Sequence, residues 1–301
     1  MKDYTAEDWL PSHSGLGESP LYRASDDTLF FVDIKNQLVH SVPIAQGWAK
    51  KKTLELPEPV TRVHVVAGRQ DVLAVQTKLG FALLDLQKGT LDRINEVCHA
   101  DDERELDGKV RMNDGAVDAK GRWWAGTMAL DEESKLGRLW CLREGRVEDM
   151  SSSSGGQGEE ERAAVPNGPV FSPDDRIMYV CDTPQGKIYR YDYDVESGAA
   201  TNRRLFVQLE GGGMPDGAAV DVEGHVWVAA NSQGKLVRYS PEGEVSGTCA
   251  VPGAKMTSCP AFGVDDMKTL FITSIAAEGS TGNVYRVRVD VAGVEQHPYR
   301  I

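Results

Sequence analysis

The feature that most constrains the fold of this 301-residue chain is a hairpin pattern that recurs along its length. Short β-rich runs are each followed, after a polar or glycine-containing turn, by a second run, which is typical of hairpins. The six pairs are residues 29–34 with 38–42, 72–76 with 81–86, 123–127 with 139–142, 177–181 with 188–193, 226–230 with 236–239, and 270–273 with 284–289. They recur about every 40 to 55 residues, the span of one propeller blade. We therefore predict an all-β fold, a six-bladed β-propeller with four-stranded antiparallel blades.

Most of these repeats begin with a similar turn. Asp and Gly or a second Asp precede the first run at residues 118–121, 173–175 and 221–224, and in weaker form at 25–27. Asp bonds its own backbone and Gly accepts positive φ, so both favour tight turns. A shared turn indicates repeated blades, whereas the alternative is a β-sandwich of unrelated hairpins.

We expect residues 1–301 to form a single propeller domain, since all-β domains of this length are common. One segment departs from the repeat. Residues 151–161, SSSSGGQGEEE, contain no apolar side chain to bury, which predicts a mobile insertion loop between the third and fourth blades.

Composition excludes several classes of partner. The formal charge of −13 disfavours nucleic acid and anionic membranes, although an acidic balance is also a simple means of solubility. The amino terminus is acidic where a signal peptide is basic, and no run of about 18 apolar residues occurs. The cysteines lack C-x-x-C spacing, which argues against a disulfide framework or a thiolate zinc site. These residues are Cys98, Cys141, Cys181, Cys249 and Cys259. We predict a cytoplasmic protein, a monomer or weak homo-oligomer.

Polar residues recur at one offset in different repeats. Counting back about ten or eleven residues from the second strand of a repeat reaches the start of its innermost strand. In four of the six repeats, the residue at this position is a carboxylate or an amide. These residues are Glu18, Asn113, Asn167 and Asp216. Rotational near-symmetry in a propeller directs such side chains at one point on the axis. Taken singly, Asn-Gly and Asp-Gly also occur as ordinary turn dipeptides.

Two carboxylates with one or two amide carbonyls are ligands for a hard or borderline divalent cation. Calcium, magnesium, manganese and zinc all fit this donor set. Arg111 lies two residues before Asn113, so on a strand both side chains share one face and Arg111 overlooks the metal. Its guanidinium suits the oxygen atoms of a ligand, the alternative being a salt bridge to Asp114.

Other candidate residues give weaker signals. No His-Glu-x-x-His, Gly-x-Ser-x-Gly or Walker pattern is present, which argues against zincin, serine-triad and nucleotide chemistry. His64 is a candidate pocket residue, with a packed or surface histidine as the alternative. Asp131, Glu132 and Glu133 form a candidate lid over the mouth, with Glu132 placed toward the substrate, or else a solvated acidic loop.

The residues resemble the senescence marker protein, gluconolactonase and luciferin-regenerating enzyme family, also called regucalcin-like. The resemblance covers nearly the whole chain. It is carried by Gly17-Glu18-Ser19-Pro20, Arg111-Met112-Asn113-Asp114-Gly115, Asn167-Gly168, Pro215-Asp216-Gly217, Trp227-Val228-Ala229 and Phe271-Ile272-Thr273-Ser274. The segments 129–135 and 151–161 depart from the family pattern, and the first of these helps to set which lactone fits.

This resemblance implies a propeller that hydrolyses a small sugar-type lactone with one divalent metal, Ca²⁺ or Zn²⁺ before Mn²⁺ or Mg²⁺. It places the metal on Glu18, Asn167 and Asp216, and the substrate on Arg111 and Asn113. The metal polarises the carbonyl and Asp216 activates water. Two alternatives stay open: a paraoxonase-like or phosphotriesterase-like calcium hydrolase that recruits Asn113 as a ligand, and a non-catalytic metal-binding scaffold.

Overall fold

The computed structural model describes residues 2–97, 108–150 and 162–301. The predicted insertion loop at 151–161 and Cys98 lie outside these residues. In the described ranges the regular secondary structure is almost entirely β-strand, with short 3-10 helices at Ala24–Asp26, Trp48–Lys50 and Glu210–Gly212.

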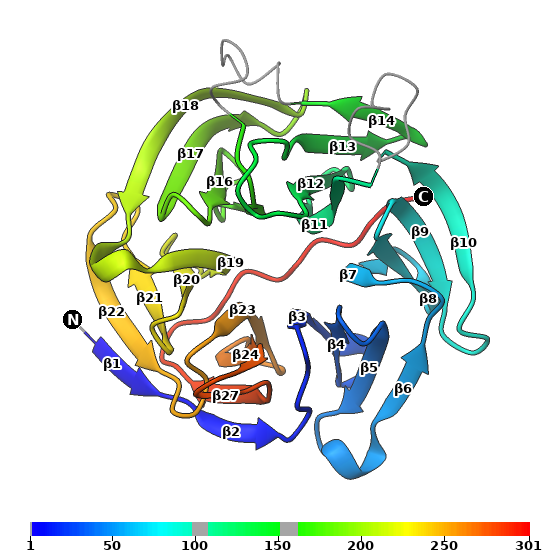
Figure 1. The fold of residues 1–301 in the computed structure, drawn as a ribbon, viewed down its shortest axis with the longest axis horizontal. Coiled ribbons are helices and arrows are strands. Elements are labelled where there is room, and N and C mark those ends of the chain that lie inside the picture. The colour runs from blue at the N-terminus through cyan, green and yellow to red at the C-terminus, as the bar shows by residue number, and fades with distance from the viewer. Residues whose placement is uncertain (1, 98–107, 151–161) are drawn as a thin grey trace. The chain divides into compact units, whose positions relative to one another are not determined.

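Over these ranges the chain forms six blades, each with four strands in antiparallel order (Figure 1). Blade 1 contains β3 (Gly17–Arg23), β4 (Thr28–Asp33), β5 (Leu38–Pro43) and β6 (Lys52–Glu55); blade 2 contains β7 (Val60–Val66), β8 (Arg69–Thr77), β9 (Gly80–Asp85) and β10 (Leu91–Glu96). Blade 3 contains β11 (Val110–Val117), β12 (Trp123–Ala129), β13 (Leu139–Arg143) and β14 (Arg146–Asp149); blade 4 contains β15 (Pro166–Phe171), β16 (Ile177–Asp182), β17 (Lys187–Asp194) and β18 (Ala199–Gln208). Blade 5 contains β19 (Met214–Val220), β20 (Val226–Asn231), β21 (Lys235–Tyr239) and β22 (Val245–Ala250); blade 6 contains β23 (Thr257–Gly263), β24 (Thr269–Ser274), β27 (Val284–Arg288) and β2 (Glu7–Leu10). The short strands β25 (Ala276–Ala277) and β26 (Ser280–Thr281) pair with each other.

The predicted hairpins are confirmed as the two middle strands of each blade. In blade 1, for example, β4 and β5 pair antiparallel with Phe31 opposite His40. The boundaries agree to within a few residues because alternating apolar side chains and turn residues define strand and turn locally.

The chain comprises two compact units. Unit 1 comprises Met1–Val63 and Leu209–Glu295, and unit 2 comprises His64–Gln208 and Gln296–Ile301. Blades 1, 5 and 6 belong to unit 1, while blades 3 and 4 and most of blade 2 belong to unit 2. The single-domain organisation stays a prediction.

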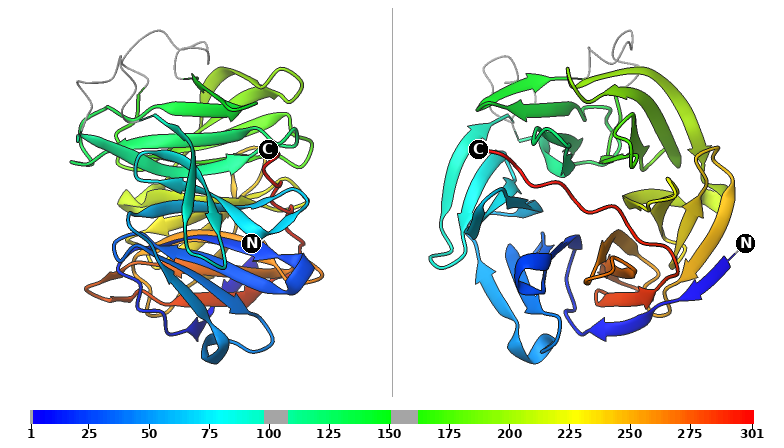
Figure 2. Two further views of the ribbon diagram at one scale, coloured as in Figure 1. Left: turned by 90° about the vertical axis from the view of Figure 1, so that its right-hand side faces the viewer. Right: turned by 180° about the vertical axis from the view of Figure 1, so that it is seen from behind.

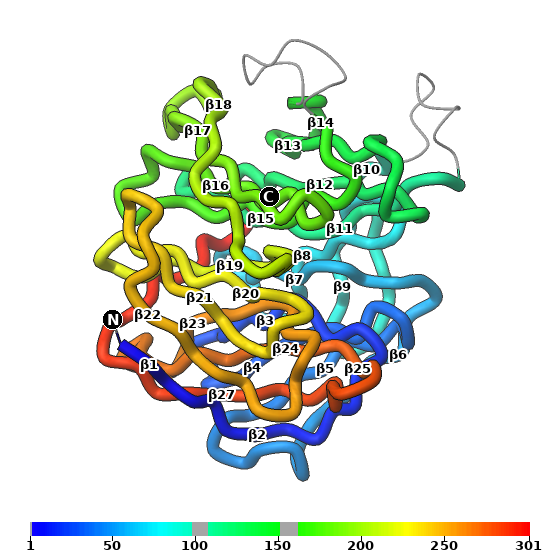
Figure 3. Tube along the Cα trace, turned by 60° about the vertical axis from the view of Figure 1, so that its left-hand side comes forward, coloured from blue at the N-terminus to red at the C-terminus, as the bar shows by residue number. Residues whose placement is uncertain are grey.

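The amino-terminal segment adds strands that the sequence repeat does not reveal. In unit 1, β1 (Lys2–Thr5) pairs parallel with β22, with Tyr4 opposite Cys249, and β2 pairs antiparallel with β27 (Figures 2 and 3). The four antiparallel strands of each blade are as predicted, and β1 adds a fifth, parallel strand at the β22 edge of blade 5. Blade 6 is completed by a strand from the opposite end of the sequence.

The hydrophobic core of each unit lies between neighbouring blades. In unit 1 the side chains of Trp227, Phe262 and Tyr285 meet between blades 5 and 6, and in unit 2 those of Phe81 and Trp123 meet between blades 2 and 3. The second strand of a blade is covered on both faces, so β4 and β20 are buried at every residue. Burial on both faces explains their continuous apolar sequences.

The Asp-containing turns form as predicted. Asp118 Oδ1 accepts hydrogen bonds from the backbone N–H groups of Lys120 and Arg122, both at 2.9 Å, and Gly121 takes a φ of +83°. Asp221 accepts the corresponding bonds in blade 5, where Gly224 has a φ of +82°. The carboxylate thus satisfies turn amides that would otherwise lack acceptors, and glycine accepts the left-handed backbone conformation without strain.

The four described cysteines, Cys141, Cys181, Cys249 and Cys259, are buried and form no disulfide with one another. Burial raises the pKa of both Cys141 and Cys249 to about 12. Among the described residues, the structure contains no helix of the length and apolarity that crossing a membrane requires.

A buried histidine makes the stability of blade 1 dependent on pH. His40 is 4% exposed and contacts the rings of Phe31 and Trp48. Burial lowers its pKa from 6.5 to about 4, despite the opposing effect of Asp33. As the pH falls, the unfolded chain therefore protonates His40 before the folded protein does. The contribution of neutral His40 to stability is complete above about pH 6.5 and is lost as the pH falls toward 4.

We expect His40→Gln to remove up to about 3 kcal/mol of the stability loss between pH 7 and pH 4. Urea unfolding of the wild-type protein and the variant at pH 7 and pH 4 gives the stability loss of each. Comparing the two losses cancels any pH-independent cost of the substitution. Equal losses in both proteins would contradict the assignment.

Candidate functional site

The first strands of blades 1, 3, 4, 5 and 6 share an irregularity near their starts. At this point two residues of the first strand lie opposite one residue of the second, which is the arrangement of a β-bulge. The residue pairs are Ser19-Pro20, Asn113-Asp114, Gly168-Pro169, Asp216-Gly217 and Ser258-Cys259. All four predicted polar residues lie within this bulge or directly before it. Bulges change the direction of side chains, so the shared offset has a structural basis.

The bulge also corrects the alternative interpretation of Asn-Gly and Asp-Gly as turns. Asn113 lies inside β11 and Asp216 inside β19, and both side chains are buried. The glycines are required for close approach: a Cβ on Gly217 would lie 2.5 Å from the Cys259 sulfur. Glycine within a strand is typical of such a bulge or close contact.

Unit 2 brings three of the predicted residues together. The Asn113 amide nitrogen donates to Asn167 Oδ1 at 2.9 Å and to the Pro166 carbonyl at 3.0 Å. Arg111 Nη1 donates to Asn113 Oδ1 at 3.0 Å. Asp114 accepts from the Gly168 backbone N–H at 2.7 Å, so its carboxylate joins β11 to β15. The result is a continuous polar cluster on two neighbouring strands.

Unit 1 contains the two predicted carboxylates. Glu18 on β3 and Asp216 on β19 are each 8% exposed, and β23 contacts both of these strands (Figure 1). Glu18 Oε2 accepts from the Ser19 backbone N–H at 3.0 Å, and Asp216 Oδ2 accepts from Asn231 Nδ2 at 3.1 Å. That Glu18 and Asp216 share one site with Asn167 stays a prediction.

Two further polar residues escape the sequence analysis. Thr183 follows β16 and accepts from Asn167 Nδ2 at 2.8 Å, while Asn231 ends β20 and bonds Asp216. The registers of blades 4 and 5 show that Thr183 and Asn231 occupy equivalent positions. Each therefore supports the candidate ligand of its own blade. The sequence signal was a polar residue at the end of the apolar second strand or directly after it.

The weaker candidates have distinct surroundings. His64 is buried and packs edge-on against Trp123 at 5.3 Å, so it is a packed histidine. Glu132 is exposed in the turn that follows β12, next to the exposed Asp131. The Ser134 hydroxyl and the backbone N–H groups of Ser134 and Glu133 donate to Asp131 and lower its pKa. This turn lies at the end of the β11–β12 hairpin that carries Arg111.

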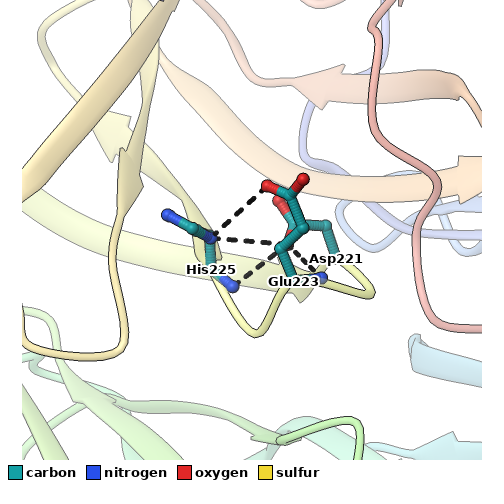
Figure 4. A group of neighbouring side chains, drawn as sticks. All are labelled: Asp221, Glu223 and His225. Carbon is teal, nitrogen blue, oxygen red and sulfur yellow. Dashed lines mark hydrogen bonds and ion pairs between the residues drawn. The ribbon is translucent and has the colours of Figure 1, made fainter. Parts of the chain in front are cut away.

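A different acidic group in unit 1 has the composition of a metal site. Candidate ligand atoms of Asp221, Glu223 and His225 lie within 4.8 Å of one another (Figure 4). Arg238, however, donates to Asp221 at 2.8 Å and to Glu223 at 2.7 Å, and Trp227 donates to Asp221 at 2.9 Å. The bond from Arg238 lowers the pKa of Glu223. A guanidinium thus already supplies the positive charge, and the group stabilises the blade turn.

Solved structures agree with this architecture. A calcium-binding protein, regucalcin, from Agrobacterium tumefaciens matches with a TM-score of 0.87 and 25% identity, covering 100% of both chains. Together with the blades described above, this likeness defines the class of protein: a six-bladed β-propeller.

The family model described as SMP-30/Gluconolactonase/LRE-like region matches residues 16–276. The chain belongs to this family, which confirms the resemblance seen in its motifs. Pentonolactonase XacC of Haloferax volcanii is 31% identical over 95% of this chain and 94% of that protein. The 6-deoxy-6-sulfogluconolactonase of Pseudomonas putida is 32% identical over 93% of each.

Proposed function

We propose that this protein is a metal-dependent lactonase that hydrolyses a small sugar-type lactone to its hydroxy acid. The family and the two relatives named for lactone hydrolysis support the reaction class. The observation that carries the proposal is the recurrence of buried carboxylate and amide groups at one bulge in different blades. Burying two carboxylates is costly without a compensating positive charge, which a bound cation supplies.

Glu18, Asn167 and Asp216 are the proposed ligands of one divalent cation. Their donors are oxygen atoms, as Ca²⁺ and Mg²⁺ require and as Mn²⁺ and Zn²⁺ accept. A further observation fits a cation: Asn231 Oδ1, on the residue bonded to Asp216, is buried and has no hydrogen-bond partner among the described residues. We favour Ca²⁺ or Zn²⁺, and regucalcin of Agrobacterium tumefaciens is described as calcium-binding.

Asp216 is the proposed general base. A divalent cation in this site supplies Lewis-acid polarisation of a carbonyl oxygen. An Asp216 oxygen that is not committed to the cation accepts a proton from the attacking water. The bond from Asn231 holds this carboxylate in one orientation, which keeps the accepting oxygen in place as the reaction proceeds.

Arg111 and Asn113 are proposed to bind oxygen atoms of the substrate. If Asn113 were a metal ligand, it would bind the cation through Oδ1. This oxygen already accepts a hydrogen bond from Arg111. A guanidinium on that oxygen opposes binding of a dication, so the geometry favours the lactonase over the phosphotriesterase-like alternative with its additional Asn ligand. Glu132, in the exposed turn after β12, is proposed to contact the substrate from the lid. The cytoplasmic location and the monomeric or weakly oligomeric state stay predictions.

A lactone panel tests this function. The protein is stripped with EDTA, reloaded with Ca²⁺, Zn²⁺, Mn²⁺ or Mg²⁺, and assayed by acid release against aldonolactones, aryl esters and a phosphotriester. We expect hydrolysis of one or more aldonolactones above the blank rate, loss of this activity in EDTA, and recovery with a single preferred cation. Activity that is unaffected by EDTA, or that is confined to the phosphotriester, would overturn the proposal.

A further inference from the structure

Asn231 has an unusual environment in unit 1. It is 5% exposed, its amide nitrogen donates to Asp216 Oδ2, and its amide oxygen is buried without a partner in the described part of the chain. A buried acceptor without a partner is costly, and native structures contain few of them. The arrangement therefore calls for a positive partner near Asp216.

The orientation of the amide does not remove this requirement. With the nitrogen toward Asp216, as observed, the oxygen lacks a donor. With the amide reversed, its oxygen would face a carboxylate oxygen, and two acceptors in contact repel unless a cation lies between them. Both orientations leave an oxygen of Asn231 in need of positive charge.

The size of the missing partner is also restricted. Asn231 Oδ1 is inaccessible to water. A calcium ion approaches oxygen to about 2.3 to 2.6 Å, closer than the roughly 2.7 to 3.0 Å of a water molecule. A cation can therefore approach Asn231 Oδ1 more closely than a water molecule can.

The equivalent residue of blade 4 gives an internal comparison. The Thr183 hydroxyl accepts from Asn167 Nδ2, and its side chain has no carbonyl oxygen. A threonine at this position thus supports the neighbouring side chain without supplying an additional ligand. Asn231 differs from it by the oxygen that has no partner.

We infer that Asn231 Oδ1 is an additional ligand of the cation held by Asp216, so that one amide both orients Asp216 and coordinates the metal. This inference rests on the metal site of the proposed function. It extends the proposed ligand set from the first strands of the blades to the end of a second strand. It also adds a role in metal affinity to the orienting role of Asn231.

Two substitutions at Asn231 separate coordination from simple support. Asn231→Thr removes the unpaired oxygen and keeps a hydroxyl that can donate to Asp216, at the position from which the Thr183 hydroxyl reaches Asn167. Asn231→Asp keeps an oxygen ligand, loses the donor and places two carboxylates side by side. Calorimetry with Ca²⁺ and Zn²⁺ measures cation affinity, and thermal unfolding in EDTA measures the metal-free stability.

We expect opposite effects from the two variants. Asn231→Thr should weaken cation binding by at least the roughly ten- to hundredfold typical of an outer-shell loss. It should also raise the Tm in EDTA by roughly 2 to 6 °C, because the unpaired buried oxygen is gone. Asn231→Asp should bind the cation at least as tightly as wild type and have a lower Tm in EDTA. Equal weakening by both variants, or unchanged affinity in Asn231→Thr, would overturn the inference.

Asn283 provides a matched control in the same unit. It is also buried and donates to a carboxylate, Asp8, at 2.8 Å, but its oxygen accepts from the His13 backbone N–H. Asn283→Thr should lower stability without changing cation affinity. If the two Asn231 variants behave as expected but the wild-type protein hydrolyses no lactone, the proposed function alone is overturned. Wild-type protein that binds no cation would overturn this inference together with the proposed metal site.

Discussion

Replacing Asp216 with Asn should lower kcat/KM for the preferred lactone by roughly a thousandfold, the scale of losing a general base. It should also weaken cation binding at least a hundredfold, because one of the two proposed carboxylate ligands becomes neutral. The amide has nearly the same size as the carboxylate, so the fold around β19 should be retained. Acid-release assays and calorimetry with Ca²⁺ and Zn²⁺ measure the two effects on the same preparation.

The two readouts separate the roles assigned to Asp216. Saturating cation that restores occupancy without restoring kcat would support the general-base role, whereas full recovery of kcat would limit Asp216 to metal binding. Asp71→Asn is the control, since Asp71 is an exposed carboxylate paired with Arg69 and should leave both quantities unchanged. Wild-type kcat/KM and affinity in Asp216→Asn would refute both roles.

Deleting residues 2–10 should destabilise the protein by roughly 5 kcal/mol or more, on the scale of losing more than one large core side chain. The deletion removes β2, so β27 loses its outer partner in blade 6. It also removes Leu10, which is 1% exposed, and Trp9, whose ring lies 5.1 Å from that of Phe271. Urea unfolding followed by tryptophan fluorescence and far-UV circular dichroism measures the loss.

A shorter deletion distinguishes the contributions of the two strands. Removing residues 2–5 eliminates β1 alone, whose side chains are largely exposed and whose Lys2–Asp290 ion pair lies at the surface. Exposed pairs contribute little, so this variant should lose no more than about 2 kcal/mol. If both deletions cost the same, the loss would come from β1 on blade 5, and the contribution assigned to β2 on blade 6 would be refuted.

Several features of the fold follow directly from local sequence. The middle hairpins of the blades are set by apolar runs separated by turn residues, and the turns at Asp118 and Asp221 form through bonds between a carboxylate and nearby backbone amides. These interactions span only a few residues, so they can be predicted from the sequence. The same holds for the shared offset of Glu18, Asn113, Asn167 and Asp216, because each repeat places it at the same distance from its hairpin.

Other features depend on residues that are distant in sequence. The pairing of β1 with β22 and of β2 with β27 joins segments more than 240 and 270 residues apart, and the short sequence of each strand does not specify its partner. The bulges were also hidden, since Asn-Asp-Gly and Asp-Gly are common in turns and only the opposing strand shows that they lie inside β11 and β19.

Spacing within one blade is sufficient to predict the repeat, the blade hairpins, the turn chemistry and the positions of the candidate ligands. The side chains that support those ligands could not be predicted in this way, because they lie on other strands. Asn231 lies 15 residues after Asp216 and meets it because a second strand runs back along the first. The same is true of Arg238, which donates to Asp221 and Glu223 from another strand, a contact that no local sequence pattern predicts.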